Sequence, residues 1–402
     1  MRHLLTVSPL VLALSACGLN GTDRDKAGDQ NGGSAAASNR IQTPASDGAL
    51  LSHDPTGNAP LDPVLADDKP RPEMQAQVVL DRLGFTPGVV DGAMGLSTRN
   101  ALRGFQLANN LKETGELDEA TKQALGQWSN IPATRVVTIP ADFAAGPFYL
   151  VPKDAQDKAK MPGLGYQSLD EKLAERFHTT VAVLKELNPA LATPGAMPSA
   201  TLTPSPTASA SGAAFTPQPG PASSFSAGQQ LRVPNVGADR IDPAQVKDGA
   251  WLATLTMLGV GSEQPKADKI VVDKSAGTLL AYDTAGKLIA AYTATMGSTN
   301  DPLPLGDWKI LGKAFNPPFA YNPDLFWDAK ASDAKAKFPP GPNGPVGVVW
   351  IDLSKEHYGI HGTPEPETIG RAESHGCVRL TNWDAARLAQ MVSGSTKVSF
   401  VA

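Results

Sequence analysis

A cysteine and three histidines gather near the C-terminal end of this chain. Cys377 closes the run Ser374-His375-Gly376-Cys377, and His357, His361 and His375 all lie within the twenty residues before it. A free thiol has a pKa of about 8.5 and is mostly protonated at neutral pH, so a nucleophilic cysteine needs a base within hydrogen-bond reach. These residue types therefore indicate attack of a thiolate on a carbonyl carbon.

Each further role in such a reaction has a candidate nearby in the sequence. His361 precedes Cys377 by sixteen positions, which is enough for a loop between adjacent strands to bring the imidazole beside the thiol. Gly376 permits a close backbone approach, so the amides of Gly376 and Cys377 can point at one carbonyl oxygen. Arg379 would share a side with Cys377 in an extended segment and could hold a substrate carboxylate.

Other readings of the same residues stay open at this point. A cysteine is often a small buried apolar residue, and Arg379 could be an ion-pair partner only. His357, His361, His375 and Cys377 are also types that bind zinc, although their spacing fits no common structural zinc pattern. We expect His357 to be structural, and nothing in the sequence implies a metal or another cofactor.

The surrounding sequence resembles the signature of the L,D-transpeptidase (YkuD) catalytic domain. The resemblance is carried by His361-Gly362-Thr363-Pro364, by Ile369-Gly370 and by the run from Ser374 to Leu380, and it extends over roughly residues 267–402. One departure is Pro302-Leu303-Pro304-Leu305-Gly306, where many members have Thr-Pro-x-Gly.

The resemblance implies a role for each residue of the motif. Cys377 would be the nucleophile and His361 the base, with the backbone carbonyl of Gly362 orienting the imidazole. The backbone amides of His375, Gly376 and Cys377 would form the oxyanion hole. Ser374, His375 and Arg379 would bind substrate or support the loop, and we assign Ser374 and Arg379 to substrate binding.

Alternating apolar residues predict a mainly-β C-terminal domain of sandwich or barrel-like form, which would position these groups. Strands are predicted at Lys269–Asp273, Thr278–Tyr282, Lys287–Thr295, Trp308–Leu311, Val346–Leu353 and Lys397–Val401. A helix should begin after an N-cap at Asn382 and stop at Gly394. The aromatic segment from Phe315 to Trp327 could cover the substrate groove or form an edge of the core.

Residues 72–128 carry a helical pattern. A first helix should end at Gly84, Thr98 should start a second, and Asp118 should open a third. The sequence from Leu80 to Leu125 resembles the small three-helix peptidoglycan-binding domain. The ligand contacts of that family are too loosely defined to transfer to single residues.

Residues 146–236 resemble a LysM glycan-binding module of α+β type. Two short helices, Ser168 to Phe177 and Val181 to Pro189, precede a strand at Gly228 to Pro234. The first strand is poor, and a Pro/Ser/Thr/Ala-rich insertion at residues 192–224 should be disordered. The alternative is a spacer that orients its neighbours.

The N-terminus has a basic start and an apolar run from Leu4 to Leu14, too short to span a bilayer. Residues 1–17 end in Leu-Ser-Ala-Cys, which resembles a bacterial lipoprotein signal with lipid on Cys17. Gly18 in place of Asp favours the periplasmic face of the outer membrane. Residues 18–70 lack aromatic residues and should form a disordered tether.

Taken together, these features predict a multidomain peptidoglycan enzyme. The 402 residues carry a net charge of −5, which gives no basic surface for nucleic acid. The enzyme would make a thioester with a stem peptide and pass it to an amine, forming 3–3 cross-links or attaching a protein to the wall. The alternatives are a peptidoglycan-binding tethering lipoprotein, and an L,D-carboxypeptidase or amidase that uses the same Cys/His pair.

Overall fold

A computed structural model describes residues 65, 69–189, 191, 215–237, 241–327, 329 and 334–402. The predicted signal segment with Cys17, most of the predicted tether 18–70, and residues 192–214 of the predicted insertion lie outside these residues. Among the residues described, no helix is both long and apolar enough to cross a membrane.

The C-terminal part is mainly β, as predicted. Its strands are β4 (Lys269–Asp273), β5 (Thr278–Tyr282), β6 (Leu288–Thr293), β7 (Thr295–Met296), β8 (Gly306–Phe315), β11 (Val349–Leu353), β12 (Gly359–His361), β13 (Val378–Arg379) and β14 (Lys397–Val401). With β1 (Phe85–Thr86), they form one ten-stranded sheet in the order β1-β6-β5-β4-β14-β8-β11-β12-β13-β7. A separate hairpin pairs β9 (Phe319–Tyr321) with β10 (Ala336–Phe338).

Two passages of the chain join the halves of this sheet. Strand β8 pairs with β14 through its first four residues and with β11 through the remainder. Strands β6 and β7 are separated only by Ala294, yet β6 pairs with β5 and β7 pairs with β13. The ten strands therefore form one continuous sheet, because β8 is longer than its predicted extent of Trp308–Leu311. The sequence had left open a sandwich of separate sheets.

Two helices cover this core. Helix α9 (Asn382–Met391) begins after Thr381, whose hydroxyl accepts a hydrogen bond from the backbone N–H of Asp384 at 3.1 Å. The predicted N-cap Asn382 is thus wrong by one residue, because the preceding threonine caps and leaves the asparagine side chain for another contact. Helix α8 (Gly249–Leu258), which the sequence analysis did not predict, buries Trp251, Leu255 and Leu258 in the same core.

The N-terminal bundle consists of α1 (Pro72–Leu83), α2 (Leu96–Ala108) and α3 (Glu119–Leu125), followed by the 3-10 turn Gly126–Trp128. Gly84 ends α1 in the left-handed conformation, and Asp118 caps α3, as predicted. Helix α2 starts two residues before the predicted Thr98, whose hydroxyl instead accepts a hydrogen bond from the buried Gln77 at 2.9 Å.

The middle segment is built around an antiparallel strand pair, β2 (Thr134–Thr138) and β3 (Gln230–Pro234). Helices α4 (Ala141–Ala144), α5 (Ala155–Ala159), α6 (Leu169–Arg176) and α7 (Val181–Leu187) lie between the two strands in sequence. Asn188 ties α7 to β3, because its amide donates to the carbonyl of Arg232 and accepts from the Arg232 N–H, both at 2.8 Å. The strand that pairs with β3 lies before residue 146, so the segment starts earlier than predicted.

The predicted disordered insertion, residues 192–224, is too long at its C-terminal end. Residues 215–224 are described, and the backbone N–H of Leu150 donates to the carbonyl of Gln218 at 2.9 Å. The N–H of Ser224 also donates to the carboxylate of Asp170 at 2.8 Å. These bonds return the chain to β3, a tertiary effect that composition alone does not reveal.

A buried ion pair joins the bundle to the β-rich part. Asp81 on α1 receives two hydrogen bonds from Arg387 on α9, at 2.9 and 3.0 Å, and both side chains are almost fully buried. His178, after α6, contacts Asp81 at 3.2 Å through Nδ1 and the carbonyl of Leu258 at 3.0 Å through Nε2. Its ring also stacks on Trp383 at 4.8 Å, so three segments meet at one carboxylate.

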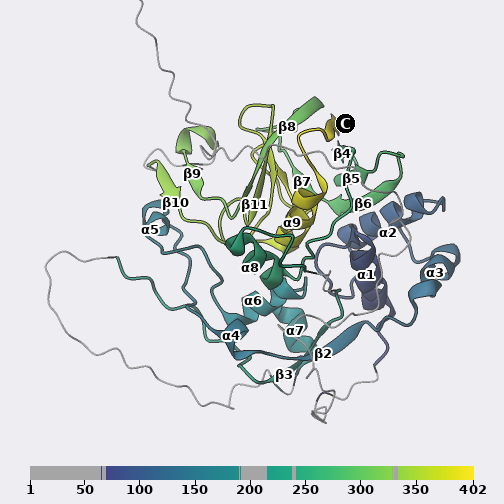
Figure 1. Cartoon of the computed structure of the whole chain (residues 1–402), viewed down its shortest axis with the longest axis horizontal. Coiled ribbons are helices and arrows are strands. Elements are labelled where there is room, and N and C mark those ends of the chain that lie inside the picture. The colour runs from purple at the N-terminus through teal and green to yellow at the C-terminus, as the bar shows by residue number, and fades with distance from the viewer. Residues whose placement is uncertain are drawn as a thin grey trace, which may run out of the picture.

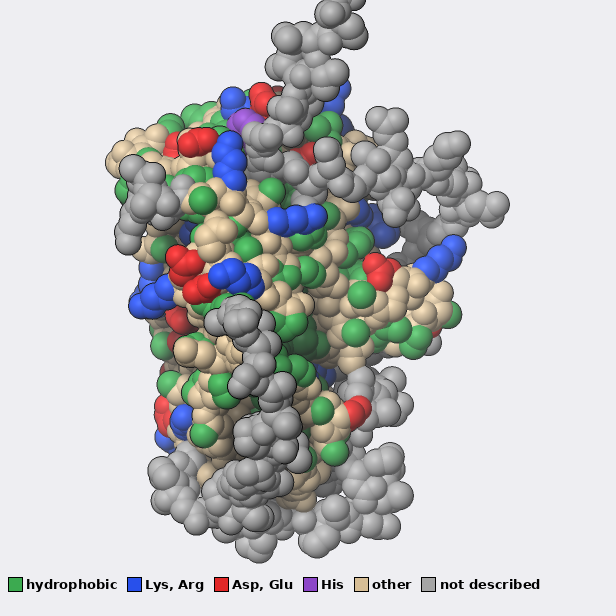
Figure 2. Space-filling view, turned by 90° about the vertical axis from the view of Figure 1, so that its left-hand side faces the viewer, with side chains coloured by type: hydrophobic (Ala, Val, Ile, Leu, Met, Phe, Trp, Pro, Cys, Tyr) green, Lys and Arg blue, Asp and Glu red, His purple; other side chains and the backbone are tan. Residues whose placement is uncertain are grey.

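The three regions therefore pack against one another (Figure 1). Strand β1 pairs in parallel with β6, and Leu80, Phe85 and Leu102 of the bundle share a core with Leu288 and Ala291. On the face in Figure 2, acidic and basic side chains are interspersed with apolar ones rather than gathered by sign. This agrees with the small net charge.

Replacing Arg387 by Met should lower the free energy of unfolding by about 3–5 kcal/mol, because Asp81 would stay buried without its main partner. Urea denaturation followed by tryptophan fluorescence measures this. The double variant Asp81→Leu/Arg387→Met should recover much of the loss, and Arg103→Met, at an exposed site on α2, should change little. Equal stability of Arg387→Met and wild type would contradict a structural role for the pair.

Candidate active site

Two neighbouring strands place the predicted base and nucleophile. Strands β12 and β13 are parallel, with Ile360 opposite Val378 and His361 opposite Arg379. Ile360 and Val378 are fully buried in the core, and side chains alternate along a strand. His361 and Arg379 therefore share the opposite face of this strand pair. Cys377 directly precedes β13 and packs against the cluster that contains Trp350, whose ring stacks on His361 at 5.5 Å.

His361 is held in one tautomer. Its Nδ1 lies 2.7 Å from the carbonyl oxygen of Gly362, an acceptor, so Nδ1 carries the proton and Nε2 keeps its lone pair. Burial, helped by the positive charge of Arg379 and opposed by the Gly362 bond, lowers the pKa of His361 to about 3. The imidazole is therefore neutral near pH 7 and can accept a proton. This geometry matches the role predicted for Gly362.

Cys377 is a partly buried free thiol. Its Sγ lies 3.7 Å from the carbonyl oxygen of His357, whose backbone has a φ of 68°. The side chain of His357 is exposed and contacts Glu356 at 3.6 Å. His357 thus meets the thiol through its backbone and not through its ring, which agrees with the structural role that we expected.

Ser374 braces the loop that carries the thiol. Its hydroxyl accepts from the N–H of Gly297 at 2.6 Å and donates to the carbonyl of Cys377 at 2.7 Å. The N–H of Ser374 also donates to the carbonyl of Gly297 at 3.1 Å, and the residue is 2% exposed. Ser374 therefore supports the loop, one of the two roles that the resemblance implied, and its assignment to substrate binding stays a prediction.

Gly376 occupies a position that excludes side chains. Its φ is +93°, and a Cβ there would lie 2.5 Å from the ring of Tyr358. Burial, together with the charges of Asp301 and Cys377, raises the pKa of Tyr358, so the tyrosine stays protonated. Gly376 lets the loop turn against this ring, whereas the predicted oxyanion hole of backbone amides at residues 375–377 stays a prediction.

Arg379 and His375 flank the thiol. Arg379 is partly exposed, with Nη1 3.4 Å from the carbonyl of Glu373, so it can still reach a substrate carboxylate. The His375 ring contacts Phe326 at 4.9 Å and Trp327 at 5.5 Å between centroids. His375 thus joins the catalytic loop to the aromatic segment.

The aromatic segment covers the thiol side of the sheet. Tyr321 stacks on Phe326 and Phe338 at 5.5 and 5.6 Å. Phe319 and Phe338 belong to a buried cluster with Trp350, against which Cys377 packs. Met161 and Leu164 of the middle segment belong to it too. The segment is therefore both a cover and an edge of the core, and the sequence left these two readings open.

Sequence reasoning missed two neighbours of the reacting groups. The Trp350 ring stacks on His361 at 5.5 Å, because these residues are opposite each other on β11 and β12. Tyr358 backs Gly376, as described above. A tryptophan on a predicted strand was a usable signal, but the pairing register that aligns it with His361 cannot be read from the sequence.

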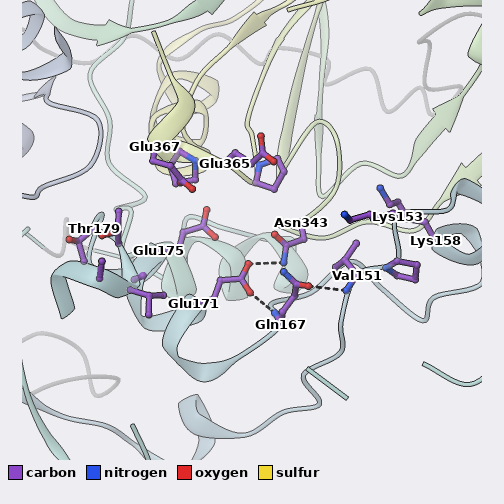
Figure 3. A pocket seen from close by; sticks show the side chains of 17 residues that line it. Val151, Lys153, Lys158, Gln167, Glu171, Glu175, Thr179, Asn343, Glu365 and Glu367 are labelled. Carbon is purple, nitrogen blue, oxygen red and sulfur yellow. Dashed lines mark hydrogen bonds between the residues drawn. The ribbon is translucent and has the colours of Figure 1, made fainter. Parts of the chain in front are cut away.

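A pocket of about 700 Å³ opens between the middle segment and the loop after His361. Figure 3 shows Glu171 and Glu175 of α6 across from Glu365 and Glu367 of that loop. Asn343 donates to Glu171 at 2.8 Å. Burial raises the pKa of Glu171, and it raises the pKa of Glu175 to about 7.

Within the described ranges, no three His, Cys, Asp or Glu side chains are grouped so that they could hold a metal ion. The cysteine and histidines of the zinc alternative are used instead in the contacts given above.

Comparison with known families agrees with the geometry. Residues 267–399 match the family described as "L,D-transpeptidase catalytic domain". This part of the chain is an L,D-transpeptidase catalytic domain. Residues 74–125 match the family described as "Putative peptidoglycan binding domain". The transpeptidase domain thus contains the whole Cys377–His361 site, whereas Glu171 and Glu175 lie outside both matched regions.

Curated relatives of this chain include proteins named as L,D-transpeptidases. The "Putative L,D-transpeptidase YkuD" of Bacillus licheniformis is 33% identical over 131 residues, which are 33% of this chain and 64% of that protein. The "Putative L,D-transpeptidase in ATP synthase subunits region ORF 5" of Fuscovulum blasticum is 28% identical over 182 residues, which are 44% of this chain and 90% of that protein.

A solved L,D-transpeptidase from Mycobacterium smegmatis aligns with a TM-score of 0.28 and 22% identity, over 34% of this chain and 59% of that chain. The chain thus spans less than two thirds of the first-named relative and of this solved structure.

The low pKa of His361 predicts how acylation of Cys377 depends on pH. Because the folded-state pKa is lowered to about 3, the basic form persists when pH falls through 6.5, the ordinary value for histidine. The acylation rate constant should therefore stay nearly constant from pH 8 to pH 5. Stopped samples analysed by intact-protein mass spectrometry measure it, and a half-maximal rate near pH 6.5 would contradict the prediction.

Ser374→Ala should slow acylation by about tenfold, because the Cys377 carbonyl and the Gly297 N–H both lose their bond to the hydroxyl. The same loss should lower the free energy of unfolding by about 1–3 kcal/mol. Ser354→Ala, at an exposed serine after β11, is the control. Wild-type acylation by Ser374→Ala would show that the brace is dispensable.

Proposed function

We propose that this protein is an L,D-transpeptidase of peptidoglycan that works through a thioester on Cys377. The observation that carries the proposal is the neutral His361, with its proton on Nδ1 at the Gly362 carbonyl, stacked on Trp350 of the cluster against which Cys377 packs. The family match over residues 267–399 supports the substrate class.

The reaction follows from these groups in two transfers. The thiol gives its proton to Nε2 of His361 while sulfur attacks a stem-peptide carbonyl, and the resulting oxyanion is bound by the backbone amides of the 375–377 loop. The imidazolium then gives the proton to the departing amine of D-Ala, and a thioester remains. An acceptor amine attacks this thioester and passes its proton to His361, which restores the thiol as an amide bond forms.

The identity of the acceptor defines the product. A second stem peptide gives a 3–3 cross-link, and an amine of a wall-attached protein gives protein anchoring. Attack of water on the thioester would give carboxypeptidase activity. Arg379, two residues after Cys377 and partly exposed, is suited to hold a carboxylate of the donor stem. We favour cross-linking, with the other outcomes as results of the test below.

The other segments would hold the enzyme at the wall. We propose that Cys17 carries lipid and that residues 18–70 form a tether from the periplasmic face of the outer membrane. We also propose that the predicted residues 146–236, extended at the N-terminal side to include β2, form a LysM-like module. The strand pair β2–β3 with α6 and α7 between the strands supports the last point.

Binding of peptidoglycan without chemistry is the second candidate function, favoured by the match of residues 74–125. The two functions are compatible, because the bundle and the catalytic site lie on different elements. Deleting the bundle would not separate them, since it would expose β6 and remove Asp81 from Arg387.

Incubation of the full chain in detergent with a disaccharide-tetrapeptide should produce a dimer that lacks one D-Ala, seen by mass spectrometry. Cys377→Ala should reduce this by at least about 10³-fold while the protein keeps its melting temperature, because the nucleophile is lost and the fold is not. Turnover by Cys377→Ala would refute the mechanism. Monomeric tripeptide as the only product would instead indicate hydrolysis.

Cys377→Ala should still sediment with purified sacculi, because wall binding is assigned to segments other than the catalytic loop. The bound fraction in a pelleting assay measures this, with an unrelated protein of similar charge as the control. Loss of sedimentation in Cys377→Ala would mean that retention on the wall depends on the thioester, and would argue against the second function.

A further inference from the structure

Gly362, whose carbonyl orients His361, has its backbone packed against a side chain from α9. Asn382 is fully buried, and its Oδ1 accepts a hydrogen bond from the N–H of Val348 at 3.2 Å. The same oxygen lies 2.2 Å from where a Cβ on Gly362 would be, and 1.9 Å from where one on Gly347 would be. Asn382 thus packs directly against the Gly362 backbone, and no larger residue fits at either glycine.

The other end of the Asn382 amide is fixed from outside the catalytic domain. Its Nδ2 donates to Oε1 of Glu175 on α6 at 2.7 Å, and to the carbonyl of Pro342 at 3.2 Å. Glu175 is 9% exposed and lies before residue 267, in the middle segment. The shorter bond of the amide therefore goes to a different part of the chain.

These contacts form a continuous series from α6 to the base. Glu175 fixes the Asn382 amide, Asn382 fixes the Gly362 backbone, and the Gly362 carbonyl holds Nδ1 of His361 at 2.7 Å. The N–H of Gly362 donates to the carbonyl of Val349 at 3.3 Å, but this N–H belongs to the peptide plane before the one that carries the Gly362 carbonyl. Misplacement of a catalytic group by about 1 Å can cost on the order of 10²-fold in rate.

We propose that Glu175 is a positioning residue for His361, so that the middle segment completes the active site of the transpeptidase domain. The inference rests on the proposed function, because it takes His361 to be the base for Cys377. The catalytic domain is then incomplete without α6.

The role of Glu175 is to supply an acceptor at a fixed place, and a charge is not required for it. Burial raises its pKa to about 7 and outweighs the opposite effects of Tyr166 and of the hydrogen bond from Asn382, and the charge of Glu171 adds to the increase. Both the ionised and the protonated carboxyl offer an oxygen to Asn382. A glutamine should therefore replace Glu175, whereas a methionine of similar volume should not.

The test uses the full chain with Glu175→Met, Glu175→Gln and, as a control, Glu186→Met at an exposed site on α7. The first readout is the ¹⁵N spectrum of the imidazoles at pH 7, with the His361 signals assigned from a His361→Gln sample. The second is the rate at which a tetrapeptide donor acylates Cys377, followed by intact mass. Circular dichroism and melting temperature establish that each variant is folded.

Glu175→Met should lose the pure Nδ1–H tautomer of His361 and acylate about tenfold more slowly, with an unchanged KM for the donor. Glu175→Gln should restore the tautomer and most of the rate, and Glu186→Met should match wild type. The proposal is overturned if Glu175→Met keeps both the tautomer and the rate, or if a folded Glu175→Gln loses the tautomer. Absence of any acyl-enzyme in wild type would refute the proposed function, and the tautomer would still test the positioning role.

Discussion

The buried contact of Asp81 with Arg387 is the constraint on which the arrangement of the chain depends. An unpaired carboxylate at this depth would be strongly destabilising, so α1 and α9 must meet in one orientation. His178 adds the middle segment to the same carboxylate. Because α9 also carries Asn382, the docking of the bundle, the position of α6 and the support of the active site are coupled through one helix.

Exclusion of water has a chemical consequence at the active site. The environment that disfavours charge on His361 keeps the imidazole in the form that accepts a proton. Trp350 stacked on one side and the aromatic hairpin near the thiol maintain that environment. Loop geometry is set separately, by the two bonds of the Ser374 hydroxyl and by the turn at Gly376. The apolar environment of His361 and the position of the loop that carries Cys377 are thus controlled by different residues.

Local signals were enough to predict several elements. The strands Lys269–Asp273, Thr278–Tyr282 and Lys397–Val401 have the predicted bounds, because alternation and turn residues act over a few positions. The contact of the Gly362 carbonyl with His361 is the one that the resemblance to the motif implied. Strand β1 was missed because of a long-range effect, since it is a strand only where β6 lies beside it. Glu175 carries no local signal, since its partner Asn382 is 207 positions away.

Strand β1 fixes the position of the bundle relative to the catalytic sheet. By adding two residues to the edge of the catalytic sheet, it makes the bundle a rigid extension of the enzyme and not a freely hinged arm. If the bundle binds a polymer, the Cys377 thiol acts at a fixed distance from the bound position. The distance between the wall-binding surface of the bundle and Cys377 would then be set by the fold. It would not depend on the length of the N-terminal segment.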